Sequence, residues 1–170
     1  MSADTAQLFL ESACNSLLHE HWPRLRECVC SLTDEQVWWR PNPASNSIGN
    51  LLLHLNGNVG QWIVATFNRT EDTRNRPHEF AERGPAPAAG LLARLGSTVE
   101  EAGAVLSRLS NADLLSTYEI QGYTVTGLYV VFHCVEHFAS HYGQIAYITK
   151  ELQNRDLGFF RNLDRTGRAK

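Results

Sequence analysis

Apolar residues recur at helical spacing in a long segment between Ser47 and Phe67. The apolar positions follow one face of a helix with a period of about 3.6 residues. This stripe consists of Ile48, Leu51, Leu52, Leu55, Val59, Trp62 and Ile63. A polar line runs beside the stripe and consists of Asn50, His54, Asn58 and Gln61. The pattern predicts an amphipathic helix that buries its apolar face.

Similar patterns predict three further helices, over about 3–29, 90–109 and 126–152. In the first of them, Pro23 lacks the backbone N–H that a helix interior needs, so we expect a kink or a restart near His21. In the last, the apolar residues predict a wide core face. That face consists of Leu128, Val131, Phe132, Val135, Phe138, Ala139, Tyr142, Ile145, Ala146 and Thr149.

The segments between these helices carry shorter signals. Thr33–Gln36 has the sequence of a capping box and predicts a short helical turn. Residues 68–89 are polar and contain three prolines, which indicates a long connection across one end of the molecule. Residues 116–126 are rich in β-branched side chains around a central glycine and predict a small β-hairpin. The tail after Asn154, with its polar run Arg161–Lys170, is expected to be irregular.

These elements predict an all-α fold. Four long helices with one long crossover predict an antiparallel four-helix bundle. The small hairpin near 116–126 is an addition to this bundle. The length of 170 residues fits a single domain over 1–170 that buries its own core. Hydrophobic residues make up 43% and charged residues 19%, a composition that excludes a disordered chain.

Charge and hydropathy exclude several kinds of partner. The formal net charge is −3 and the isoelectric point is about 6.1, so the basic excess of a nucleic-acid-binding protein is missing. Apolar stretches are interrupted well before the roughly 18 residues that a transmembrane helix needs. The first residues lack the pattern of a signal peptide, and we therefore expect a cytoplasmic protein. In that compartment we expect reduced, buried cysteines at Cys14, Cys28, Cys30 and Cys134.

The last predicted helix carries histidines at positions 133, 137 and 141. Residues four apart lie on one stripe of a helix, about 6 Å apart, so two neighbouring imidazoles can reach one metal ion. Three successive turns span about 12 Å, too far for one ion at about 2 Å from each nitrogen. Either His133 with His137 or His137 with His141 can therefore be the pair, and a third ligand must come from another helix.

His54, on the polar line of the second predicted helix, is the best candidate for this third ligand. Three neutral imidazoles leave coordination positions open, which is typical of catalytic rather than structural metal sites. Two alternatives stay open at this point: His54 can be a hydrogen-bonded core residue, and the polar line can be a seam between helices. His19, His21 and His78 are expected at the surface.

Two segments resemble the DinB (damage-inducible) superfamily, also called the DinB/YfiT-like metalloenzymes. They are residues 45–63, SNSIGNLLLHLNGNVGQWI, and residues 130–152, VVFHCVEHFASHYGQIAYITKEL. The runs WWRPNP at 38–43 and TRNRPHEFAERG at 73–84 resemble one bacterial branch of unknown function. The resemblance extends from the first helix to about Arg161.

The resemblance implies a bundle that commonly pairs as a homodimer and holds a divalent metal. The implied ligands are His54, His137 and His141. His133 then either lines the pocket or contacts the ligands without binding the metal itself. A surplus of apolar surface also favours the homodimer, and it includes Trp22, Trp38, Trp39 and Trp62. The superfamily name suggests a link to DNA damage, but the acidic isoelectric point gives no support for DNA contact.

The metal site points to two kinds of chemistry on a small-molecule substrate. The metal can lower the pKa of a water molecule for hydrolysis, or deprotonate a thiol that attacks an electrophile. Some relatives use a low-molecular-weight thiol such as bacillithiol or mycothiol for S-transfer. Asn50, Asn58 and Gln144 can orient substrate or metal-bound water, and Glu136 can act as a base only if it turns toward the metal.

The identity of the metal is open, because three histidines with open positions suit zinc, nickel or ferrous iron. The main alternative to an enzyme is a non-catalytic helical dimer that binds a metal or a small ligand for storage, sensing or stability. A further alternative is a plain helical dimer without a metal.

Overall fold

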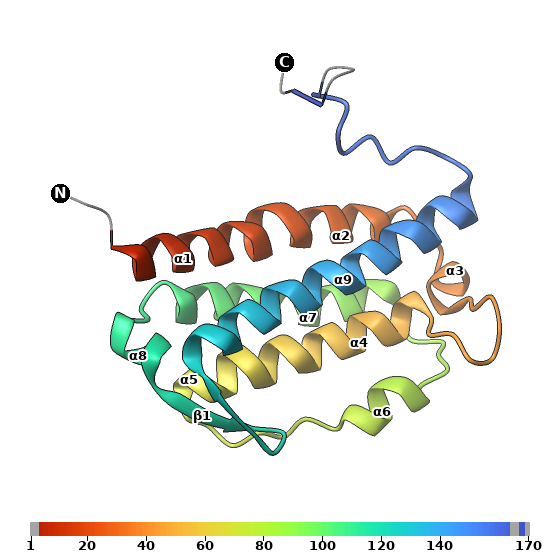
Figure 1. Ribbon diagram of the computed structural model, residues 1–170. Coiled ribbons are helices and arrows are strands. Elements are labelled where there is room, and N and C mark those ends of the chain that lie inside the picture. Colours follow the sequence, from red (N-terminus) through yellow and green to blue (C-terminus); the bar gives the residue numbers. More distant parts are fainter. Residues whose placement is uncertain (1–3, 164–166, 169–170) are drawn as a thin grey trace.

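Helices dominate the computed structural model of the protein, which describes residues 4–163 and 167–168 (Figure 1). In chain order the elements are α1 (Thr5–Cys14), η1 (Asn15–His21), α2 (Trp22–Cys30), α3 (Asp34–Trp38), α4 (Ile48–Val59), η2 (Gly60–Ala65), α5 (Thr66–Asn68), α6 (Arg76–Ala81), α7 (Ala88–Leu106), α8 (Asn111–Leu115), β1 (Thr117–Ile120), β2 (Tyr123–Thr126) and α9 (Gly127–Gln153). The elements labelled η are π-helical. The predicted helical class with one small hairpin is confirmed. The expected helix start at Ala3 and part of the run Arg161–Lys170 lie outside the described residues.

Long helical segments lie side by side along the described part of the chain (Figure 1). They are α1–η1–α2, α4–η2–α5, α7 and α9. The first and last segments run in one direction, and the two middle segments run in the other. Because α4–η2–α5 and α7 run the same way, residues 69–87 must cross back along the molecule between them. A long crossover is present, but it runs along the molecule and not across one end, because α7 starts at the same end as α4.

The apolar stripe of α4 and η2 forms the centre of the core. All seven predicted stripe residues are buried. The helix starts at a capping box in which the Ser47 hydroxyl accepts a hydrogen bond from the Asn50 N–H, and the Asn50 side chain accepts one from the Ser47 N–H. This start fixes which side of α4 faces the core and therefore where its polar line lies.

The first segment restarts where its proline predicts. The π-helical turn η1 ends at His21, and α2 begins at Trp22 with Pro23 in its first turn. The backbone stays helical at His21 and Trp22, and the Trp22 N–H bonds to the Leu17 carbonyl, so the chain passes the proline through a wider π-helical turn without leaving the helix. The capping box at Thr33 and Gln36 is also present and starts α3.

Two short helices were not predicted from the sequence. Within 68–89, expected to be a connection, α6 is capped by Asn75, whose side chain accepts a hydrogen bond from the His78 N–H. Helix α8 starts at a capping box formed by Ser110 and Asp113. Helices of five or six residues contain too few turns to show a hydrophobic period, so only their capping residues mark them in the sequence.

The predicted hairpin is present. Strands β1 and β2 pair in antiparallel register, with Ile120 opposite Tyr123. The two residues between them, Gln121 and Gly122, have φ values of 55° and 82°. Left-handed backbone at both positions is typical of the type I′ turn, whose twist matches the twist of a hairpin.

The predicted core face of α9 was too wide. Leu128 and Phe132 are 47% and 52% exposed, whereas Val130 and Cys134, which lay outside the predicted face, are fully buried. Helix α9 has apolar residues around most of its circumference, so the period alone does not show which side faces α2 and α4. An exposed apolar side remains on this helix.

Two further expectations about buried side chains were wrong. Cys28 and Cys134 are buried as expected, but Cys14 is half-buried and Cys30 is exposed; all four thiols are free. Trp62, expected to add to the apolar surface, is 4% exposed and belongs to the core.

Among the described residues, no helix is both long and apolar enough to cross a membrane.

Candidate metal centre

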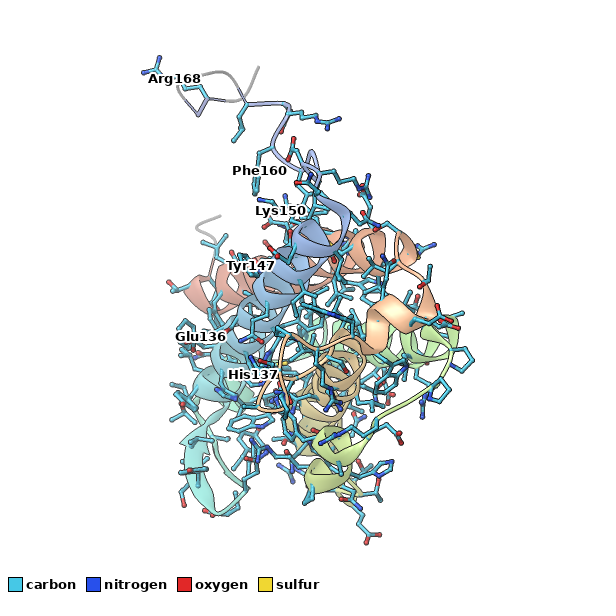
Figure 2. All side chains as sticks on the ribbon, turned by 90° about the vertical axis from the view of Figure 1, so that its right-hand side faces the viewer. Glu136, His137, Tyr147, Lys150, Phe160 and Arg168 are labelled. Atoms are coloured by element: carbon cyan, nitrogen blue, oxygen red, sulfur yellow. The ribbon has the colours of Figure 1, made fainter. Side chains whose placement is uncertain are left out.

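Helices α4 and α9 bring three imidazoles together. His54 comes from α4, and His137 and His141 lie one turn apart on α9; one ring nitrogen of each lies within 4.8 Å of the others. Nε2 of His54 lies 2.8 Å from Nε2 of His137. The ring centroids of His54 and His141 are 4.9 Å apart. Figure 2 shows His137 on the inner side of α9, toward the rest of the fold, and Glu136 on the outer side.

The second nitrogen of His54 is held by a buried carboxylate. Nδ1 of His54 lies 2.8 Å from Oε2 of Glu79, a residue of α6 that is only 6% exposed. A carboxylate beside Nδ1 accepts its proton and leaves the lone pair on Nε2, the nitrogen that faces the other two histidines. A carboxylate behind a histidine is the usual arrangement around metal-binding imidazoles.

Arg74 in turn holds Glu79. Its Nε donates to Oε1 of Glu79 over 2.7 Å, its Nη2 donates to Oε2 over 2.9 Å, and its Nη1 donates to Oε1 of Gln61 over 2.9 Å. Burial alone raises the pKa of the Glu79 carboxyl, but the hydrogen bonds and charges of Arg74 and His54 hold that pKa below its usual value. Glu79 is therefore an anion at neutral pH, held by a bidentate arginine.

Gln144 holds the third imidazole. Oε1 of Gln144 lies 2.9 Å from Nδ1 of His141. The amide oxygen accepts the proton of Nδ1, so the lone pair of His141 is also on Nε2. Gln144 was predicted as a residue that orients substrate, and the structure places it against a histidine of the cluster.

The histidines of α9 are poor bases in this setting. Burial, followed by the charges of His141 and His54, lowers the pKa of His137 to about 3. Burial lowers the pKa of His141 by more than its hydrogen bond with Gln144 raises it. Both rings are neutral at pH 7, which is the protonation state that a metal ligand requires.

The donor set fits a divalent metal. Three nitrogen donors converge from two helices, and the free nitrogens of two rings are fixed by oxygen acceptors on the far side. Imidazole nitrogens are suitable ligands for zinc, nickel and ferrous iron, the three metals expected from the sequence. The group therefore could hold such an ion.

A pocket of about 310 Å³ lies beside the cluster. It is bounded by α4, η2, α9, the hairpin and the start of α6, and its described residues are His54, Asn58, Trp62, Arg74, Arg76, Gln121, Tyr123, Val125, Tyr129, His133 and His137. Its size is at the lower end of the range for small-molecule sites. Aromatic and cationic side chains dominate the wall.

His133 and Asn58 lie in this pocket. The His133 ring is half-buried, with its centroid 4.0 Å from that of Trp62 and 5.3 Å from that of His137. Burial lowers the pKa of His133, although the Glu136 charge acts in the opposite direction. Asn58 is buried, and no described residue forms a hydrogen bond with its Oδ1 atom.

Asn50 lies apart from the pocket. Its Nδ2 donates to the carbonyl oxygens of Glu79 and Glu82, and its Oδ1 accepts a hydrogen bond from Arg40 over 2.6 Å. Asn50 therefore ties the crossover segment to α4 and places Glu79 beside His54. Glu136 is exposed and points away from the cluster (Figure 2).

The remaining histidines lie outside the cluster. His19 and His78 are exposed, as expected. His21 was expected at the surface, but it is half-buried and its ring stacks on Tyr142, with 5.7 Å between the centroids. The π-helical turn that ends at His21 packs against α9, which covers this ring.

The interpretation of the sequence missed Arg74 and Glu79. Both lie in the crossover, where no hydrophobic period exists, and the run 73–84 was used only for its resemblance to a family branch. A local signal was present: Asn75 as an N-cap and Pro77 in the first turn predict a short helix. Such a helix would have placed Glu79 on an ordered element.

Comparison with known proteins adds a family and a fold. The family described as the DinB superfamily matches residues 17–145. A conserved protein from Enterococcus faecalis superposes with a TM-score of 0.71 at 18% sequence identity, covering 91% of this chain and 100% of that one. A DinB-like protein from Bacillus cereus superposes with a TM-score of 0.62 at 15% identity, covering 85% and 90%. No curated protein matches the chain.

Proposed function

The chain belongs to the DinB superfamily, and on this premise we propose that it binds one divalent metal ion and uses it on a small-molecule substrate. The proposed ligands are His54, His137 and His141. One observation carries the proposal: three imidazoles converge while Glu79 and Gln144 occupy the opposite nitrogens of two of them. A seam of ordinary core histidines does not require that arrangement.

The proposed reaction is a transfer from a low-molecular-weight thiol or a hydrolysis. A bound metal supplies the acidity for either, because it lowers the pKa of a thiol or a water molecule that it coordinates. The chain's own residues orient the participants: Glu79 fixes the ring of His54, and Gln144 fixes the ring of His141. Asn58 and His133 face the pocket in which the substrate would bind.

Two measurements test this proposal in sequence. The first is metal analysis of the untagged protein, with the three ligand histidines replaced singly by alanine; we expect one ion per chain in the wild type and none in the variants. The second is an activity screen of glutathione, bacillithiol and mycothiol against electrophiles. Bound metal without turnover in this screen and in hydrolase assays would favour the non-catalytic alternative, and absence of metal would contradict both.

We also propose a homodimer. The exposed side of α9 carries Leu128, Phe132 and Tyr147, which are 47%, 52% and 71% exposed. Tyr147 lies along the same outer edge of the helix as Glu136 (Figure 2). Large apolar side chains gathered on one helix face favour contact with another protein surface. Four free thiols fit the cytoplasm as the proposed location.

A further inference from the structure

Arg76, in the wall of the pocket, has no ion-pair or hydrogen-bond partner among the described residues. It is the first residue of α6, and it is exposed. Its guanidinium lies over the ring of Phe80, 5.1 Å from the centroid, and no described residue accepts a hydrogen bond from it. The guanidinium of Arg74, two residues earlier, already donates hydrogen bonds to Glu79 and Gln61.

Two residues that line the pocket also carry an unpaired polar atom. Nε1 of Trp62 and Oδ1 of Asn58 are buried, and neither has a hydrogen-bond partner in the described part of the chain. Both residues line the pocket, and they are 4% and 2% exposed. An unpaired donor and an unpaired acceptor in the interior cost free energy. Both atoms have almost no accessible surface, so they lie behind the surface of the pocket and do not face its open space.

The charge of the pocket contrasts with the charge of the whole chain. The protein carries a net charge of −3, yet none of the described residues that line the pocket is acidic, and two are arginines. The carboxylate of Glu79, behind the wall, is already bonded to Arg74 and His54, which line the pocket. The unpaired charge in the wall is therefore positive and attracts an anion.

Arg76 lies close to the histidine cluster. Both Arg76 and His54 contact the Phe80 ring: the guanidinium lies 5.1 Å from the ring centroid, and the centroid of the His54 ring lies 4.7 Å from it. A molecule of a few carbon atoms can therefore reach both the guanidinium and the cluster. Trp62, Tyr129 and His133 supply flat surfaces for its body.

We infer that the pocket selects a small organic anion, whose carboxylate or phosphate group pairs with Arg76 while its other end faces the three histidines. An arginine fork binds either group through two parallel hydrogen bonds. This inference deepens the proposed function and rests on it for the reacting end of the molecule. Arg76 is then a residue that determines specificity and does not hold the metal.

The test measures binding of defined probes to the full-length protein, with and without zinc. The probes are succinate, its neutral diamide and inorganic phosphate, and the readouts are calorimetry and tryptophan fluorescence, since Trp62 lines the pocket. We expect at least one anion to bind about 10-fold more tightly than the diamide. Comparing succinate with phosphate identifies which acid group the pocket prefers.

Matched variants assign the preference to Arg76. Arg76→Gln should abolish it, Arg76→Lys should retain part of it, and Arg94→Gln, an exposed arginine on α7, should leave it unchanged. Equal binding of anion and diamide by the wild type would overturn the inference, as would a folded Arg76→Gln protein that keeps the wild-type preference.

The two proposals fail separately. If the three histidines bind metal but the anion preference does not depend on Arg76, the inference is wrong and the proposed function stands. If no metal binds but Arg76→Gln still removes the anion preference of the metal-free protein, the inference stands and the proposed function is wrong.

Discussion

Gly57 on α4 provides the space in which the carboxylate of Glu79 lies. A Cβ atom at position 57 would lie 2.0 Å from Oε1 of Glu79 and 2.8 Å from Nε of Arg74. Glu79 is in turn hydrogen-bonded to His54, which lies on α4 one turn before Gly57. Because Gly57 has no side chain, Glu79 of the crossover can reach His54 on α4.

Gly57→Ala should therefore displace Glu79 and Arg74. We expect metal affinity to fall about 10-fold, the lower end of the effect of disturbing groups that orient metal ligands. We also expect a loss of about 1–3 kcal/mol in the free energy of unfolding, since the added methyl group overfills a packed site. Chelator competition and urea denaturation measure the two effects. Gly90→Ala on α7 is the control, because its Cβ would have no neighbour within 4 Å.

Removing any one ligand should abolish tight metal binding. We expect His54→Ala, His137→Ala and His141→Ala each to weaken zinc binding more than about 100-fold, beyond the range for residues that only orient ligands. His133→Ala should cost less, because His133 stacks beside His137 outside the cluster of three. Exposed His78 serves as the surface control. If His133→Ala loses the ion and His54→Ala retains it, the ligand set is wrong.

Glu79→Gln keeps the shape of the side chain and removes its charge. The buried guanidinium of Arg74 then loses its ionic partner; the two side chains are 4% and 8% exposed. Leaving one charge of a buried pair unpaired costs about 3–5 kcal/mol, so the thermal midpoint should fall markedly. Metal affinity should fall about 10- to 100-fold because His54 loses its orienting carboxylate. Glu136→Gln, at the exposed position beside His137, should change neither quantity.

The metal-free protein should lose stability in acid. The pKa of His137 is lowered to about 3 in the folded state, whereas in the unfolded chain it is about 6.5. Above that value neither state binds the proton; below it only the unfolded state does, so the free energy of unfolding falls as pH decreases from about 6.5 toward 3. Denaturation of wild type and His137→Asn across this range measures the contribution. A wild-type slope no steeper than that of the variant would contradict the assignment.

Replacing an apolar residue on the exposed side of α9 should separate the proposed dimer. Phe132→Glu should convert a species of about twice the 19.1 kDa chain mass into one of that mass in light scattering, because charge at a contact surface opposes association. Leu115→Glu on α8, also an exposed apolar position, is the control. A monomeric wild type at micromolar concentration would exclude the dimer.

The sequence predicted most where a helix has one apolar and one polar side. On α4 the apolar stripe faces the core and the polar line beside it carries His54 and Asn58, so the periodicity alone located a candidate ligand. On α9 the same reasoning placed Phe132 in the core, because apolar residues surround most of that helix and only its neighbours decide which are covered.

The outer part of the site depends on contacts between distant segments, which no local pattern shows. Glu79 lies 25 positions from His54 in the sequence, and the two meet because Asn50 binds the carbonyl oxygens of the crossover. The spacing of histidines on α9 offered two pairs, and the position of α4 in the fold brings His54 to His137 and His141.

The β-hairpin forms one wall of the pocket, and this wall opens more often than the walls that helices form. In the described part of the chain its two short strands form a sheet of two, and its turn is connected to η2 by a hydrogen bond of 2.5 Å from Gln121 to Gln61. Such a pair has little stability of its own and opens more often than the long helices around it. Backbone amides of β1 and β2 should therefore exchange their hydrogens with solvent sooner than those of α4 or α9. A molecule held between Arg76 and Tyr123 would slow that exchange, so deuterium uptake by this hairpin reports when the pocket is filled.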